Sequence, residues 1–224
     1  MKIELVVFDM AGTTIDEQNV VYQTVRRAIN ESGYNFSQEQ VQTAGAGKEK
    51  SQAIRDVLAL DGTEHSHKEV ATIFGNFKVM LAEAYHELDI QPQPGTLAVF
   101  EALHTAGVKV VLDTGYDRQT AEGLVAKLGW QLGRDIDALV TASDVINGRP
   151  HADMIQLAMS QVGVTDPDKV AKIGDSVIDI EEGQNASCGF TFGITTGAQT
   201  REQLLQASPT SVVDSLAEML DLLR

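Results

Sequence analysis

Short apolar runs alternate with amphipathic stretches along much of the chain. The apolar runs predict buried strands at residues 3–8, 108–112, 138–141, 169–173, 190–194 and 211–214. Apolar residues at helical spacing predict helices near residues 117–128, 151–162, 177–186, 200–206 and 215–223. This alternation predicts an α/β fold, with a doubly wound, Rossmann-like and mostly parallel sheet covered by helices on both faces.

Residues 16–88 break this alternation. Apolar residues at helical spacing mark three stretches there, at residues 20–29, 53–58 and 70–88. The sequence "QPQPGT" at 91–96 is expected to be the return linker, because proline is hard to place inside a helix, and the outward linker is expected near residues 14–18. We therefore expect a helical domain of residues 16–88 inserted into a core of residues 1–15 and 89–224.

The composition is that of an ordinary globular protein, with 43% hydrophobic residues among 224. The net charge of -15 argues against nucleic acid and anionic membranes as partners. Apolar runs are too short to span a membrane, no signal peptide is visible, and the single cysteine, Cys188, fits a cytoplasmic location. The acidic run "DIEEG" at 179–183 is expected to be a solvated helix face, apart from Asp179.

Polar residues follow four of the predicted strands. Asp9 ends the first strand, Thr114 lies in "DTGY", Arg149 in "NGRPHADM", and Asp175 and Asp179 in "IGDSVID". Because open parallel sheets bind ligands beyond the carboxyl ends of their strands, these side chains are expected to converge at one edge of the sheet.

This set of groups has a chemical logic. Asp9 and Asp175 suit Mg²⁺, which prefers oxygen ligands, and Asp179 could hold a metal-bound water. Thr114 and the backbone N–H groups of the turn after Asp9 can donate to phosphate oxygens, and Arg149 adds a fixed positive charge. An anionic substrate neutralised in this way could be attacked by the Asp9 carboxylate, giving an acyl phosphate.

The order of these motifs resembles the haloacid dehalogenase-like hydrolase superfamily, with "FDMAGTT", Thr114, Arg149 and "GDSVID" as its four motifs. The sequences "AGTT", "TGYDR", "GRPHADM" and "GDSVIDIEEGQNA" resemble its phosphonatase-like group, relatives of phosphonoacetaldehyde hydrolase. The resemblance implies a Rossmann-like core, a helical cap domain and a cap–cap homodimer. It also implies Mg²⁺ bound by Asp9, Ala11, Asp175 and Asp179, and substrate contacts from Gly12, Thr13, Gly115, Tyr116 and Lys48.

Ala11 separates this chain from common phosphatases of the superfamily. Those enzymes usually carry a second aspartate here, which protonates the leaving group and then activates water. Phosphonoacetaldehyde hydrolases also have alanine, and a cap lysine forms a Schiff base with the substrate aldehyde. The resemblance thus implies a magnesium-dependent hydrolase that uses Asp9 as nucleophile to cleave the C–P bond of a small phosphonate.

Two lysines of "AGAGKEKSQAIR" could be that cap lysine. The family pattern has a glycine three residues before the lysine and often an arginine five residues after it, and Gly47 and Arg55 fit Lys50. Gly45 also precedes Lys48 by three residues, but that register loses the arginine. We therefore expect Lys50 to be catalytic, while a lysine here could also bind only an anionic group or be solvated at a helix end.

One departure from the group leaves the substrate open. Phosphonoacetaldehyde hydrolases place a histidine three residues after the lysine, and this chain has Ala53 there. A phosphomonoesterase or phosphosugar phosphatase or mutase on the same scaffold is the alternative, although Ala11 argues against it. A third reading is a non-catalytic phospho-acceptor or binding protein, but phospho-accepting receiver domains are shorter and carry no inserted domain.

Overall fold

The computed structural model describes residues 3–223. Its centre is a six-stranded parallel sheet in the order β5-β4-β1-β6-β7-β8. The strands are β1 (Leu5–Asp9), β4 (Lys109–Thr114), β5 (Ala138–Thr141), β6 (Val170–Gly174), β7 (Phe190–Ile194) and β8 (Ser211–Val213). Because the chain leaves β1 towards β4 and later returns to its other side as β6, the carboxyl end of β1 lies where such sheets bind ligands.

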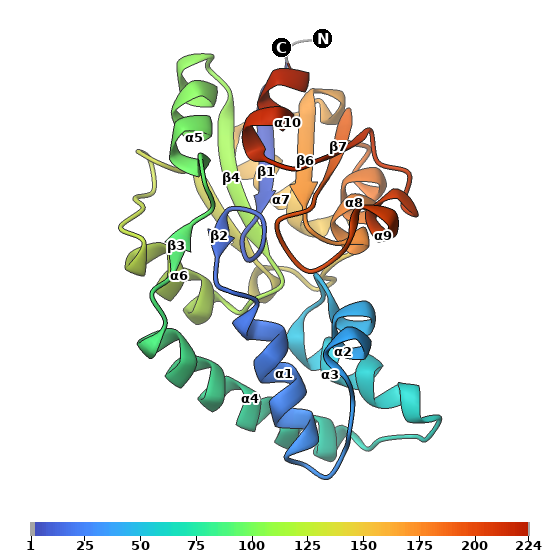
Figure 1. Ribbon diagram of the computed structural model, residues 1–224. Coiled ribbons are helices and arrows are strands. Elements are labelled where there is room, and N and C mark those ends of the chain that lie inside the picture. Colours follow the sequence, from blue (N-terminus) through green and yellow to red (C-terminus); the bar gives the residue numbers. More distant parts are fainter. Residues whose placement is uncertain (1–2, 224) are drawn as a thin grey trace.

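Helices cover both faces of this sheet (Figure 1). Those on one face are α5 (Thr96–Thr105), α6 (Arg118–Lys127) and α10 (Leu216–Leu222). Those on the other are α7 (Asp153–Val162), α8 (Val177–Asn185) and α9 (Arg201–Leu205). Because strand side chains alternate between faces, Val6 and Phe8 pack into the first layer, and Leu5 and Val7 into the second.

The insert consists of four helices: α1 (Val20–Asn30), α2 (Gln38–Gly45), α3 (Lys50–Leu58) and α4 (His67–Glu87). They lie together beyond the carboxyl ends of the strands, below the sheet in Figure 1. α1 packs along α4 and α2 packs against α3, and apolar residues such as Val25, Ile54 and Ile73 are buried between them. Short 3₁₀ turns occur at η1 (Ala59–Asp61), η2 (Ala142–Asp144) and η3 (Pro167–Lys169).

The chain enters and leaves the insert through two adjacent segments. β2 (Ile15–Asp16) pairs antiparallel with β3 (Gln91–Pro92), with Ile15 opposite Pro92. The backbone N–H of Gln93 also donates to the Thr14 carbonyl at 2.9 Å. Hydrogen bonds between the two crossings therefore hold them together.

The α/β fold with its parallel sheet is confirmed, and each expected strand and core helix is present within about two residues of its expected bounds. Two helices were not predicted. α5 follows directly after "QPQPGT", and α2 buries only Val41 and Gly45, so its apolar pattern is weak. Among the described residues, no helix has the length and apolar character to cross a membrane.

Candidate active site

Asp9 lies at the carboxyl end of β1, buried beside β4 and β6. It stands opposite Asp113 in the β1–β4 register. Its carboxylate oxygens lie within 4.8 Å of those of Asp175 and Asp179, which come from the β6–α8 segment. Burial, followed by the charge of Asp179, raises the pKa of Asp9 to about 6.

This cluster suits a divalent cation by its donor set. Magnesium prefers carboxylate oxygens, and all three carboxylates are buried. Burial and the neighbouring Asp9 and Asp179 carboxylates raise the pKa of Asp175 well above its ordinary value, because three close negative charges repel one another. A cation among them would offset that repulsion. Ala11, which can offer only a backbone oxygen, lines the space next to Asp9 and Asp175.

Arg149 is a buried cation that contacts the Asp9 carboxylate. Its Nη1 donates to Asp9 Oδ1 at 2.8 Å and lies 2.8 Å from Asp179 Oδ1. Its Nη2 donates to Asp113 Oδ1 at 2.7 Å, and its Nε donates to Glu182 at 2.9 Å. The predicted phosphate-binding arginine thus also ties four carboxylates together, and its planar fork of donors suits that task.

Asp113, Lys172 and Glu182 belong to this network and were not predicted. Lys172 lies inside β6, contacts Asp113, and reaches Asp179 and Glu182 at 3.2 Å. Glu182 is fully buried, Ile180 and Gly183 are buried as well, and only Glu181 is exposed, so the expectation that "DIEEG" forms a solvated face was wrong. The available signal was a lysine in an otherwise apolar strand, which needs a buried counter-charge to offset its desolvation.

The turn after Asp9 is built by its own hydrogen bonds. The backbone N–H of Gly12 donates to Ile15 O, and that of Thr13 donates to Met10 O, so neither points at a substrate. Gly12 has φ +84°, and a Cβ there would lie 2.3 Å from Asp175 Oδ2. The buried Thr13 hydroxyl has no hydrogen-bond partner among the described residues, so it is a free donor in this turn.

A small space of about 10 Å³ lies directly over Asp9. Ten residues line it, most of them predicted site residues: Asp9, Ala11, Tyr22, Gly47, Lys50, Thr114, Gly115, Tyr116, Arg149 and Asp175. The structure therefore brings together groups from β1, the insert, β4 and the loop before α7. A space of this size holds about one water, so a phosphoryl group can enter only if the insert moves.

The insert closes this space through its loop at residues 46–49. The Gly47 carbonyl lies 3.5 Å from Arg149 Nη1, and the Gly47 N–H donates to the Tyr22 hydroxyl at 2.9 Å. A Cβ at Gly47 would lie 2.2 Å from Ile178 Cγ2, and one at Gly115 would lie 2.8 Å from the Lys48 carbonyl. Glycine at both positions lets the loop pack directly onto the core.

Lys50 brings an amine to this space. It is the first residue of α3 and only 6% exposed, and its Nζ donates to the Lys48 carbonyl at 2.6 Å. Its Nζ also lies 5.3 Å from the ring centroids of both Tyr22 and Tyr116. Burial lowers the pKa of Lys50 to about 8, which increases the share of neutral, nucleophilic amine near neutral pH.

Lys48 points elsewhere. Its Nζ pairs with Asp56 of α3 at 2.5 Å, its side chain is 29% exposed, and it does not line the space over Asp9. Only its backbone carbonyl contacts the site, as the acceptor for Lys50. Of the two registers left open by the sequence, the geometry favours Lys50.

A chain of buried hydroxyl groups also reaches the site. Tyr116 lines the space over Asp9, and its hydroxyl lies 2.7 Å from that of Tyr85, at the end of α4. The Tyr85 hydroxyl donates to the Glu17 carboxylate at 3.4 Å. Burial raises the pKa of Glu17 to about 7. Glu17 was not predicted, because a glutamate in a linker gives no sequence signal of burial.

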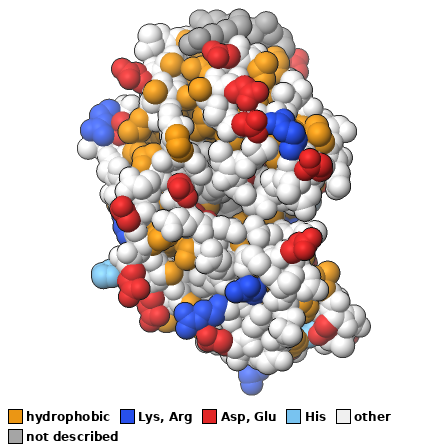
Figure 2. All heavy atoms as spheres, viewed as in Figure 1, with side chains coloured by type: hydrophobic (Ala, Val, Ile, Leu, Met, Phe, Trp, Pro, Cys, Tyr) orange, Lys and Arg blue, Asp and Glu red, His pale blue; other side chains and the backbone are white. Residues whose placement is uncertain are grey.

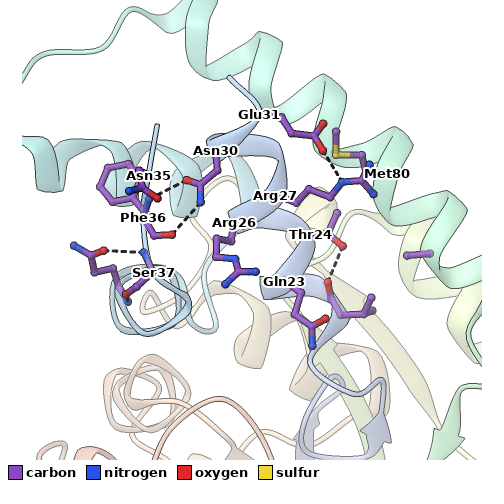
Figure 3. Close-up of a pocket in the computed structure, with 13 residues that line it drawn as sticks. Gln23, Thr24, Arg26, Arg27, Asn30, Glu31, Asn35, Phe36, Ser37 and Met80 are labelled. Carbon is purple, nitrogen blue, oxygen red and sulfur yellow. Dashed lines mark hydrogen bonds and ion pairs between the residues drawn. The ribbon is translucent and has the colours of Figure 1, made fainter. Parts of the chain in front are cut away.

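A cavity much larger than the space over Asp9 lies elsewhere in the molecule. A cavity of about 940 Å³ lies on the insert, between α1 and the loop that follows it. Figure 3 shows its polar lining, with Arg26, Asn30 and Ser37 around it. None of the predicted site residues borders it.

Comparisons with known proteins agree with the motifs. The model of the haloacid dehalogenase-like hydrolase family matches residues 3–187. A phosphonoacetaldehyde hydrolase of Lactiplantibacillus plantarum is 32% identical over 212 residues, which cover 88% of this chain and 78% of that protein.

Solved structures share the fold over the whole chain. A phosphonoacetaldehyde hydrolase-like protein from Oleispira antarctica has a TM-score of 0.84 at 24% identity, over 100% of this chain and 92% of that one. A putative phosphoglycolate phosphatase from Lactobacillus delbrueckii has a TM-score of 0.81 at 22% identity, over 100% and 99% of the two chains. At these identities the likeness concerns the fold alone.

Proposed function

Because this chain belongs to the haloacid dehalogenase-like hydrolase family, as its four motifs predicted, we propose that it is a magnesium-dependent hydrolase that cleaves the C–P bond of a small carbonyl-bearing phosphonate. Residues 16–88 would act as its cap and the remainder as its core. The observation that carries the proposal is Lys50, a buried amine that shares a small space with Asp9, while position 11 carries alanine in place of a second aspartate. An amine in this position could form an imine with a carbonyl group of the substrate. An imine next to the C–P bond can accept the electron pair that is released when that bond breaks.

The first step would form the electron acceptor. The neutral Lys50 amine adds to the substrate carbonyl and, with uptake of a proton from solvent, releases water to give a protonated imine. The Asp9 carboxylate then attacks phosphorus, the C–P bond breaks, and its electron pair moves into the imine to give an enamine. Protonation of the enamine carbon and hydrolysis of the imine would release the carbonyl product and free Lys50.

The second half would release phosphate. Water attacks the aspartyl phosphate on Asp9, and the P–O bond to the carboxylate breaks. Mg²⁺ held by Asp9, Asp175 and Asp179 would supply charge neutralisation for the phosphoryl oxygens. The Thr114 hydroxyl lines the space over Asp9 and could donate to the phosphoryl oxygens, Thr13 in the turn after Asp9 has a free hydroxyl, and Arg149 fixes the Asp9 carboxylate through Nη1.

Borohydride trapping tests this proposal directly. Incubation with phosphonoacetaldehyde and Mg²⁺, followed by borohydride, should add the mass of the reduced two-carbon fragment to Lys50. Lys50→Arg should lose both the adduct and at least about 10³-fold in kcat, because a guanidinium cannot form the imine. Lys48→Arg is the matched control and should retain both.

Two outcomes would count against C–P cleavage. The imine step fails if turnover proceeds without an adduct, or if Lys50→Arg remains active. Rapid hydrolysis of sugar phosphates with no phosphonate turnover would instead favour a phosphatase on the same scaffold. Ala11 weighs against that alternative, since an alanine beside Asp9 provides no general acid.

A further inference from the structure

A second cavity adjoins the space over Asp9. Its volume is about 490 Å³, and it lies between α4 of the insert and α6 of the core. Phe77, Leu81, Ile90 and Leu124 are each less than 5% exposed and form an apolar floor. Ligand pockets in proteins commonly have about this size and an apolar lining.

This cavity lies next to the space over Asp9, and the two share three lining residues. Lys50, Gly115 and Tyr116 line both the cavity and the space over Asp9. A carbonyl carbon bound to Lys50 would therefore have its phosphonate group on the Asp9 side. Its remaining substituent would be left on the side of α4 and α6.

Three of the charged side chains that line the cavity have partners within the protein, and Glu49 and His86 line it as well. The Nζ of Lys127 donates to the carbonyls of Tyr85 and Leu88 at the end of α4. The Nζ of Lys78 lies 5.0 Å from the centroid of the Phe74 ring. Asp117 caps α6 by accepting from the Thr120 N–H. Because its floor is apolar, the cavity suits an uncharged apolar group rather than an anion.

We propose that this cavity binds an apolar substituent on the carbonyl carbon, so that the preferred substrates are 2-oxoalkylphosphonates with an aryl or branched alkyl group. This inference rests on the proposed function, because it places the carbonyl on Lys50. A cavity of about 490 Å³ has roughly the volume of a dozen or more waters, and the hydrogen of phosphonoacetaldehyde would leave it empty. Filling it removes apolar surface from water and favours binding.

A substrate series on the wild-type enzyme gives the first measurement. We compare kcat/KM for phosphonoacetaldehyde, 2-oxopropylphosphonate and 2-oxo-2-phenylethylphosphonate, with saturating Mg²⁺. We expect the phenyl compound to exceed phosphonoacetaldehyde by at least about tenfold, since apolar pocket contacts give discrimination of this order.

A cavity-filling variant gives the second measurement. Gly123 of α6 lines the cavity, and a Cβ built there meets no atom within 4 Å. Gly123→Phe should lower kcat/KM for the phenyl compound at least about tenfold and leave phosphonoacetaldehyde within about twofold. Gly75→Phe is the matched control, because Gly75 is also a helical glycine with open space but lies outside the cavity.

The outcomes separate the two proposals. Turnover of phosphonoacetaldehyde without a preference for the phenyl compound overturns the cavity assignment and keeps the proposed function. Equal losses on both substrates in Gly123→Phe, with an unchanged melting temperature, also overturn the cavity assignment. Failure to turn over or trap any of the three phosphonates overturns both.

Discussion

Lys50 and Glu17 are two buried titratable side chains whose environments shift their pKa in opposite directions, each towards neutrality. The pKa of Lys50 falls to about 8 and that of Glu17 rises to about 7, mainly because burial disfavours the charged form of each. Both values lie within the range where an enzyme normally works. Each shift therefore has a measurable pH dependence.

The Lys50 shift predicts how turnover depends on pH. Only the neutral amine can attack a carbonyl, so kcat/KM for a phosphonate should rise about tenfold per pH unit up to about pH 8 and then level off. The measurement is kcat/KM between pH 6 and 9.5, with Lys48→Arg as the control that keeps this profile. A flat profile would contradict a catalytic amine at Lys50.

The Glu17 shift predicts a change in stability. A carboxyl whose pKa is raised on folding binds more protons in the folded state, so stability falls as pH rises from about 4.5 to about 7. Above pH 7 this penalty is at most about 3 kcal/mol. Glu17→Gln should therefore raise the free energy of unfolding by about 1–3 kcal/mol at pH 8 and change it little at pH 5. Urea unfolding at both values checks this, and equal effects at the two would refute it.

At the residue scale, the sequence predicted the groups at strand ends and missed those that pair with them. Asp9, Thr114 and Asp175 were predictable because a parallel sheet places the ends of its strands at one edge. Lys172 and Glu182 were not, because their burial depends on side-chain pairing between β6, α8 and β4. The choice between Lys48 and Lys50 also needed coordinates, since Lys50 at the start of α3 is buried, whereas Lys48 in the loop before α3 pairs with Asp56.

At the scale of elements, the contact between the insert loop and α8 controls the closed site. Gly47 has φ +71°, and its Cα lies so close to α8 that a Cβ would overlap Ile178. A side chain there would hold the loop away from the core and move Lys50 away from Asp9. Closure of the cap is thus expected to depend on one small residue.

Gly47→Ala tests this dependence. We expect kcat/KM to fall at least about tenfold, because the displaced loop misplaces the amine. Gly62→Ala is the control, since Gly62 has a similar φ of +78° but open space around its Cβ. It carries the same backbone strain without the overlap. Equal activity of the two variants would show that the loop contact does not matter for catalysis.

The elements themselves were largely predictable from the sequence. Short apolar runs between turn residues specify buried strands whatever their neighbours, and the helices between them are amphipathic. α5 was not predicted, although it follows the proline-rich segment directly and its buried residues Val99, Phe100 and Leu103 have helical spacing. α2 has a readable capping box at Ser37 and Gln40, but little apolar periodicity to support it.

At the scale of the whole molecule, the net charge of -15 opposes an anionic substrate. Figure 2 shows acidic side chains spread over both the core and the insert on the face in view. The cations at the site are buried and mostly paired with carboxylates, so they attract a substrate only at short range. The long-range field is therefore repulsive.

Salt should accordingly speed substrate capture. Raising NaCl from 10 to 150 mM shortens the Debye length from about 30 to about 8 Å and screens the repulsion. We expect kcat/KM for a phosphonate to rise about two- to fivefold while kcat stays constant, with Mg²⁺ held at saturation. A fall in kcat/KM would mean that local attraction at the site dominates the field.

The pairing of β2 with β3 has a consequence for engineering and evolution. The two segments that connect the insert to the core lie side by side and are hydrogen-bonded to each other. The insert therefore joins the core at a single two-stranded junction rather than at two separate points. A different helical unit inserted between Asp16 and Gln91 would be connected through the same junction, and the sheet and its carboxylates would stay unchanged. Such a replacement would exchange all the insert residues that face Asp9 in one step. New substrate ranges can therefore arise by recombination at this junction.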